Sequence, residues 1–170
     1  HLLQRVRFVI MPILNPMGMY MGKRSNGNGV DLMRNAPIEA DSGSTPGIAG
    51  GHRISPKLPW YRGARGAPME AEAQAVVTYF EKNFAKSESI IALDVHSGFG
   101  SVDRLWFPYA RTKKPFPHLN EIYQLTHMLD RAYPHHIYRI EPQSASYTTH
   151  GDLWDYLYDR RQAAIVTLHG

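Results

Sequence analysis

The sequence predicts an α/β fold with three layers, in which helices cover both faces of a mostly parallel or mixed sheet. Strand-like apolar runs alternate along the chain with helical patterns, and several of these runs end in polar residues and glycines. The length of 170 residues, with 43% hydrophobic and 20% charged residues, suits one domain with a sizeable core. We therefore expect residues 1–170 to form a single domain.

The first expected element is a buried strand at 5–14, RVRFVIMPIL, because most of this run is apolar and β-branched. Asn15-Pro16 and Gly18 then supply the turn chemistry that ends the strand. The stretch 41–65 is rich in Gly, Pro and Ser and lacks periodicity. We expect a long loop there, and loops of that length inside a compact domain often serve a function.

The remaining elements follow from the same two patterns. A helical pattern begins at Pro68, a residue favoured at the first helical position, and extends to residue 86. Downstream, apolar runs predict strands and amphipathic runs predict helices. The expected strands lie at 89–100, 104–110, 135–142 and 163–170, and the expected helices lie at 117–133 and 151–161.

Composition argues against several classes of partner. No apolar run approaches the roughly 20 residues of a membrane span, so we expect no membrane insertion. The absence of Cys excludes disulfides and thiol catalysis. The net charge of +4 is mild, and its basic cluster lacks a base-reading motif, which favours a solvated loop over nucleic-acid binding. The residues of this cluster are Arg104, Arg111, Lys113 and Lys114.

Polar residues follow three of the expected strands, and parallel strands place their carboxyl ends at one edge of a sheet. We therefore expect residues 28–35, His96 and His169 to meet on one rim. His96 is the candidate ligand there, although a lone histidine at a strand end is more often structural. Asp94 lies on the same strand and is a candidate to orient a neighbouring group.

Arg24 and Arg34 flank the same loop as a pair of guanidinium groups. Two such groups suit a carboxylate ligand, because each can bind it through two parallel hydrogen bonds. The alternative is a structural ion pair with Asp31 or Glu39, and the sequence favours neither interpretation.

Taken in order, five segments resemble the landmarks of the carboxypeptidase-A-like zinc metallocarboxypeptidases. They are NPMG…KRSNGNGVDLMRN, YRGARGAPMEAEA, ALDVHSGFG, LWFPYA and SYTTHGDLWDY. The resemblance implies a mixed sheet between helices, of which this chain would supply the later strands as a partial domain. It also implies a zinc cofactor and a peptide or small carboxylate substrate.

Carried over to this sequence, the resemblance implies a role for five residues. His96 matches a zinc ligand, and Arg24 matches the arginine that polarises the scissile carbonyl and holds the oxyanion. Arg34 matches the arginine that binds the terminal carboxylate of the substrate. Tyr147 matches the tyrosine that closes over the bound C-terminus, and His169 falls at the position of the general-base glutamate.

The sequence departs from this family pattern at several positions. The family's first two zinc ligands come from a His-x-x-Glu motif upstream of 5–14, and the chain opens with HLLQ instead, as expected of an incomplete or processed product. Met33 replaces an asparagine that contacts the substrate carboxylate, and Met17 replaces a turn aspartate. His169 replaces the glutamate, so it could act as a base, ligate metal, or do neither.

Two functions of different classes follow from this pattern. The first is a zinc-dependent hydrolase of C-terminal peptide or amide bonds, inactive as the chain stands. The second is a non-catalytic module that binds a carboxylate or peptide terminus through Arg24, Arg34 and Tyr147. A third, blander alternative is a structural α/β domain with a coincidental set of motifs.

Overall fold

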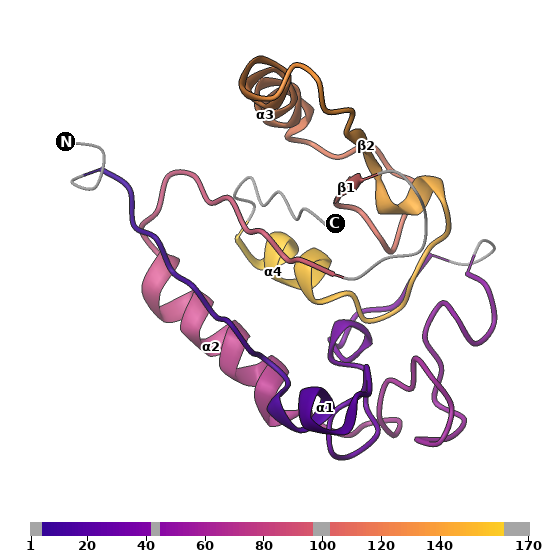
Figure 1. Cartoon of the computed structure of the whole chain (residues 1–170). Coiled ribbons are helices and arrows are strands. Elements are labelled where there is room, and N and C mark those ends of the chain that lie inside the picture. The colour runs from indigo at the N-terminus through magenta and orange to yellow at the C-terminus, as the bar shows by residue number, and fades with distance from the viewer. Residues whose placement is uncertain (1–4, 42–44, 97–102, 162–170) are drawn as a thin grey trace.

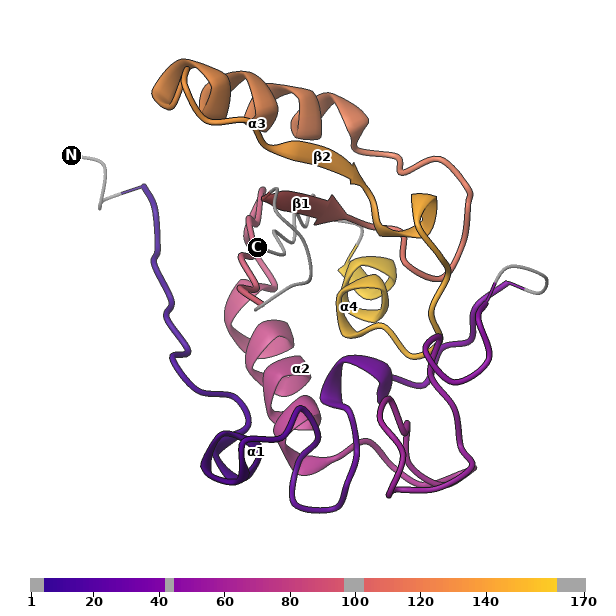
Figure 2. The ribbon, with the colours of Figure 1, turned by 45° about the vertical axis from the view of Figure 1, so that its right-hand side comes forward.

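Two short strands form the centre of a layered α/β arrangement in the computed structural model, which describes residues 5–41, 45–96 and 103–161. Strand β1 (Arg104–Phe107) pairs in parallel with β2 (Arg139–Pro142), with Leu105 opposite Ile140. Helix α3 (Leu119–Ala132) connects them and lies on one side, as Figure 2 shows. Helices α2 (Ala71–Phe84) and α4 (Leu153–Arg161) lie on the other side.

The hydrophobic core lies between the strands and the helices α2 and α4. Helix α2 buries residues spaced three and four apart, the spacing that places side chains on one helical face. Leu153 and Leu157 of α4 are fully buried and meet this face. The core cluster further contains Met33, Val76, Val77, Phe80, Ile90, Phe107, Phe116, Ile122 and Tyr158.

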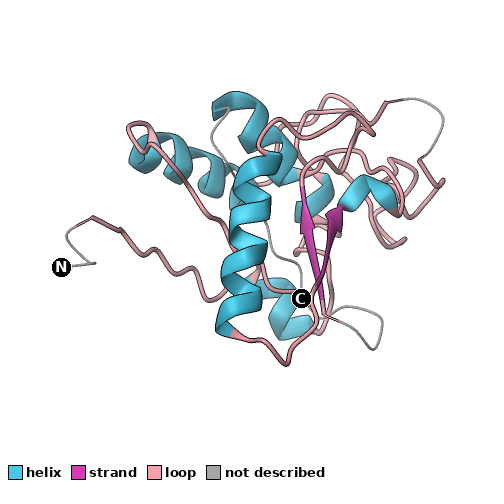
Figure 3. Cartoon of the chain, turned by 90° about the horizontal axis from the view of Figure 1, so that it is seen from above, coloured by secondary structure: helices cyan, strands magenta, loops and turns pink. Residues whose placement is uncertain are grey.

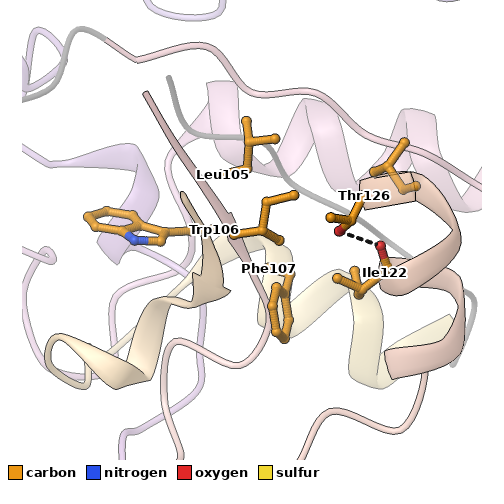
Figure 4. A pocket seen from close by; sticks show the side chains of 7 residues that line it. Leu105, Trp106, Phe107, Ile122 and Thr126 are labelled. Atoms are coloured by element: carbon orange, nitrogen blue, oxygen red, sulfur yellow. Dashed lines mark hydrogen bonds between the residues drawn. The ribbon is translucent and has the colours of Figure 1, made fainter. Parts of the chain in front are cut away.

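A narrow apolar crevice separates β1 from α3 (Figure 4). Leu105, Phe107 and Ile122 line it, and its volume of about 10 Å³ leaves room for no more than a water molecule. The Thr126 hydroxyl donates to the Ile122 carbonyl at 2.9 Å, while Trp106 points away from α3. The crevice is therefore a packing defect of the core.

The predicted helices and the predicted strands at 104–110 and 135–142 are confirmed, with shorter bounds. Helix α2 begins at Ala71 rather than at Pro68, because Glu70 is extended and its N–H donates to the Asn35 side chain at 2.6 Å. Strands β1 and β2 lie within 104–110 and 135–142 and are parallel, as the alternation of elements predicts. The predicted strand 163–170 lies outside the described residues.

Two predicted buried strands are wrong in the described structure. Residues 5–14 are extended but exposed, with Ile10 86% exposed, and the run lies beside α2, where Arg7 donates to the Asn83 carbonyl at 3.5 Å. Residues 89–96 are likewise extended, and Val95 is 75% exposed. Each run lacks a neighbouring strand among the described residues, and a strand forms only when its backbone groups find a partner. Residues 97–100 lie outside the described part.

Loops make up much of the rest of the chain (Figure 3). The turn predicted at Asn15-Pro16 is instead a short helix, α1 (Pro16–Met21), because the Asn15 side chain accepts from the Gly18 N–H at 2.9 Å and caps it. The long loop 41–65 is present where it is described, with a single bridge between His52 and Tyr61. No helix within the described ranges is long and apolar enough to cross a membrane.

Candidate functional site

The loop that precedes the 3₁₀ turn η2 (Leu32–Arg34) is held by its own polar side chains. Asn26 accepts from the Val30 N–H at 3.1 Å, and Asp31 caps η2 by accepting from the Met33 N–H at 3.0 Å. The second oxygen of Asp31 accepts from Arg24 Nε at 2.7 Å. Asp31 is buried whereas the Arg24 side chain is 45% exposed, so a fixed carboxylate holds a cation at the surface. The structural ion pair considered for the arginines is thus present at Arg24.

Arg34 lies in the interior, 4% exposed. Its Nη1 donates to the Met33 carbonyl at 3.3 Å and lies 3.9 Å from Oδ2 of Asp152. Its Nε is buried and has no hydrogen-bond partner among the described residues. A buried donor without an acceptor is costly, and it is a feature to be explained by a ligand or by strain.

Asp152 has two roles at the start of α4. Its Oδ1 accepts from the N–H groups of Trp154 and Asp155 at 3.0 Å, so it caps the helix. Burial raises the pKa of Asp152, and the positive charge of Arg34 opposes this rise. Burial and the negative charge of Asp152 raise the pKa of Asp155 well above its ordinary value, although Asp155 accepts from the Ala110 and Arg111 N–H groups.

His96 is joined to the same helix through Asp94. Oδ2 of Asp94 lies 3.0 Å from Nε2 of His96 and accepts from the Trp154 indole N–H at 2.9 Å. Asp94 is also close enough to Asp152 for its negative charge to raise the pKa of Asp152. The role expected of Asp94, to orient a neighbouring group, therefore has a structural basis: it stands between α4 and His96.

These contacts connect two of the predicted site residues, Arg34 and His96, through the start of α4. Arg24 is held by Asp31 at one end of η2, Arg34 follows at the other end and meets Asp152, and His96 lies beyond Asp94 at the same helix start. Met33 is buried in the core cluster. Tyr147 lies between η3 (Gln143–Ala145) and α4 and donates its N–H to the Gln143 carbonyl at 3.5 Å. His169 lies outside the described residues.

Arg62 and its pairing with Glu39 escaped prediction from the sequence. Arg62 is 3% exposed and donates to the Arg34 carbonyl at 3.0 Å. Glu39 is shared by Arg62 and His150, each at 2.7 Å. A lone arginine in a loop shows no recognisable sequence pattern. Gly51 and Gly151, which pack against Arg62, are the sequence signal that could have pointed to it.

Two cations of the basic cluster form ion pairs with carboxylates in the described part of the chain. Arg104 pairs with Glu141 at 2.9 Å and Arg111 with Asp159 at 2.7 Å, so two of its four cations have carboxylate partners.

Across 5–41, 45–96 and 103–161, no group of three or more His, Asp or Glu side chains could hold a metal ion. A catalytic zinc needs three protein ligands, so the described residues do not fit one by themselves.

Comparison with known proteins gives the family. The family model described as zinc carboxypeptidase matches residues 1–169, whereas no curated protein matched the sequence. A crystal structure of thrombin activatable fibrinolysis inhibitor is similar, with a TM-score of 0.72 and 21% identity over 99% of this chain. The bovine protein in complex with tick carboxypeptidase inhibitor has a TM-score of 0.68 and 20% identity over 94% of this chain.

The chain spans 44% and 56% of the length of these two structures. Their likeness establishes the α/β fold that the sequence predicts, and the match of the family model over nearly the whole chain establishes the relationship. The chain belongs to the zinc carboxypeptidase family.

Proposed function

We propose that this chain is part of a zinc-dependent metallocarboxypeptidase-like hydrolase that acts on C-terminal peptide or amide bonds, and that it is inactive by itself. The observation that supports this proposal is the contact path that joins Arg34 and His96 through the start of α4, with Arg24 held by Asp31 ahead of η2. The same three residues are those whose roles the family resemblance implies.

In this proposal Arg34 binds the terminal carboxylate of the substrate. Its buried Nε–H lacks an acceptor and supplies one donor of a guanidinium fork, the geometry that suits a carboxylate. Met33 does not replace the amide of the family asparagine, because a thioether donates no hydrogen bond. Tyr147 would close over the bound terminus.

Arg24 would stabilise the negative charge that develops on the carbonyl oxygen during hydrolysis. This role requires a cation fixed in advance, and the 2.7 Å contact with buried Asp31 provides that fixation while leaving the guanidinium accessible. His96, oriented by Asp94, would be one metal ligand, and His169 would occupy the position of the general base.

The second candidate is the non-catalytic module that binds a carboxylate terminus. The observation that favours it is the lack, within the described residues, of a group able to hold a metal. Both candidates bind a carboxylate, and neither predicts hydrolysis by this chain alone.

One assay tests the inactivity and the carboxylate binding that both candidates predict for this chain. The purified chain is incubated with a blocked dipeptide in the presence of zinc, with a chelator as control, and released C-terminal residue is measured. We expect no release and retained binding of the dipeptide. Zinc-dependent release that the chelator abolishes would show that the chain is an active hydrolase, and failure to bind the dipeptide would contradict both candidates.

A further inference from the structure

Arg62 is buried, and its guanidinium group donates hydrogen bonds to three residues between Arg34, the last residue of η2, and Glu39. Its Nε donates to the Arg34 carbonyl at 3.0 Å and its Nη2 to the Ile38 carbonyl at 2.8 Å. Its Nη1 donates to Glu39 at 2.7 Å. The planar guanidinium group thereby holds the Arg34 carbonyl, the Ile38 carbonyl and the Glu39 carboxylate at fixed positions relative to one another.

Two glycines with positive φ make room for the two arginines. At Gly51, with φ +98°, an added Cβ would lie 3.0 Å from Cδ of Arg62 and 3.3 Å from Cδ of Arg34. At Gly151, with φ +67°, an added Cβ would overlap the Arg34 carbonyl and lie 3.0 Å from Arg62 Nε. Arg34 and Arg62 are therefore packed in one cradle that side chains at either glycine would fill.

The backbone around Arg34 is tied to the same cradle. The Asn35 side chain donates to the Arg62 carbonyl at 3.0 Å, and the Ala36 N–H donates to the Gly151 carbonyl at 3.0 Å. The Arg34 side chain itself has weaker ties, namely one bond to Met33 and a 3.9 Å contact with Asp152. Its direction is consequently set by the main chain that Arg62 holds.

The charge of Arg62 is balanced at the surface. Burial raises the pKa of Glu39, but the hydrogen bond and the charge of Arg62, together with the charges of His150 and Arg53, outweigh burial and lower it. Glu39 therefore stays ionised opposite Arg62, and two buried arginines at close range do not share one carboxylate: Arg62 faces Glu39 and Arg34 faces Asp152.

We propose that Arg62 is the positioning residue for Arg34: it holds the Arg34 main chain between Gly51 and Gly151 so that the Arg34 guanidinium keeps its Nε edge directed at a carboxylate. The significance for substrate binding rests on the proposed function, whereas the effect on the geometry of Arg34 does not.

The test uses the whole chain labelled with ¹⁵N and follows the Nε–Hε signal of Arg34, which is assigned by its loss in Arg34→Lys. Arg62→Lys keeps the charge and loses the fork. Arg53→Lys is the matched control, because Arg53 lies 3.9 Å from the same Glu39 but donates its hydrogen bonds to the carbonyls of Gly63 and Ala64. We expect Arg62→Lys to shift the Arg34 signal and to speed its exchange with solvent about tenfold, the loss that one charge-assisted hydrogen bond implies. Arg53→Lys should leave the signal unchanged.

A titration with N-acetyl-L-phenylalanine separates the two claims. If the parent binds this acid, Arg62→Lys should bind it about tenfold more weakly. If the parent binds neither this acid nor N-acetyl-lysine nor N-acetyl-glutamate, the proposed function is at fault, and the comparison of Arg34 signals still decides the positioning role. An Arg34 signal that is the same in folded Arg62→Lys and in the parent would overturn the inference. Should Arg62→Lys not fold, Glu39→Gln replaces it, because it loosens Nη1 of Arg62 from the surface, and an unmoved Arg34 signal there would overturn the inference equally.

Discussion

Replacing Asp152 tests how the buried charges of the site contribute to stability. At 3.9 Å, the attraction between Asp152 and Arg34 is about 4 kcal/mol at an effective dielectric constant of roughly 20. Against it stands the cost of burying the carboxylate, and the raised pKa of Asp152 indicates that this cost exceeds the attraction. Asn in place of Asp keeps the helix cap and removes both the attraction to Arg34 and the cost of burying the negative charge. We therefore expect Asp152→Asn to change the free energy of unfolding by no more than about 1 kcal/mol.

Asp152→Ala supplies the contrast, because it also removes the two hydrogen bonds of the cap. It should be less stable than Asp152→Asn by about 1 kcal/mol. Urea unfolding followed by tryptophan fluorescence measures both, since Trp154 lies next to the substitution. A loss of 3 kcal/mol or more in Asp152→Asn, which is roughly what removing one partner of an essential buried pair costs, would refute the reasoning.

The pH dependence of the same comparison has a definite sign. A carboxyl whose folded pKa is raised contributes stability that is fully present below its ordinary value of 3.8 and is lost as pH rises through the folded pKa. Asn does not titrate. The stability of Asp152→Asn relative to the parent should therefore increase as the pH is raised from 3.8, and a decrease would show that the carboxylate is net stabilising.

The remaining predictions concern the core, a tyrosine and the metal. Leu157→Ala removes a fully buried side chain and should lower the free energy of unfolding, measured in urea, by roughly 2–5 kcal/mol. Ile10→Ala, at 86% exposure, should change it by no more than about 0.5 kcal/mol. Equal losses would show that 5–14 is part of the core. Burial and the charge of Asp159 raise the pKa of Tyr109 to about 12, so in an ultraviolet titration Asp159→Asn should ionise Tyr109 at lower pH than the parent, and an unchanged titration would exclude Asp159 as a cause. After dialysis against trace zinc the chain should retain less than one equivalent, because the described residues offer no three-ligand group, and tightly held stoichiometric zinc would contradict this.

Local sequence patterns predicted those elements whose stabilising contacts are close in the chain. Helix α3 and the β1–β2 pair follow from periodicity and from the short crossover between them. The run 5–14 shows the limit of this reasoning, because apolar β-branched residues indicate a strand but do not supply the neighbour with which it must pair. Its failure as a predicted strand is a failure of pairing, since Ile10 and its neighbours remain extended and exposed.

The site residues likewise fall into those that a local sequence pattern reveals and those that only contacts between distant parts of the chain reveal. Arg24, Arg34 and His96 were recognisable in the sequence because of the residues around them. Arg62 was not, because its three contacts depend on a loop path that brings 34–39 and Gly151 to it from distant parts of the chain. Such contacts carry no local pattern, although a buried arginine always needs partners.

Calorimetry with matched acids and amides tests the central claim most directly. N-acetyl derivatives of phenylalanine, lysine and glutamate are each compared with the corresponding C-terminal amide, using the parent chain and Arg34→Lys. The account predicts that at least one acid binds, that its amide does not, and that Arg34→Lys binds the acid about tenfold more weakly, as the loss of a charge-assisted fork implies. Equal binding of acid and amide, binding by Arg34→Lys as tight as by the parent, or no binding of any acid would contradict the account.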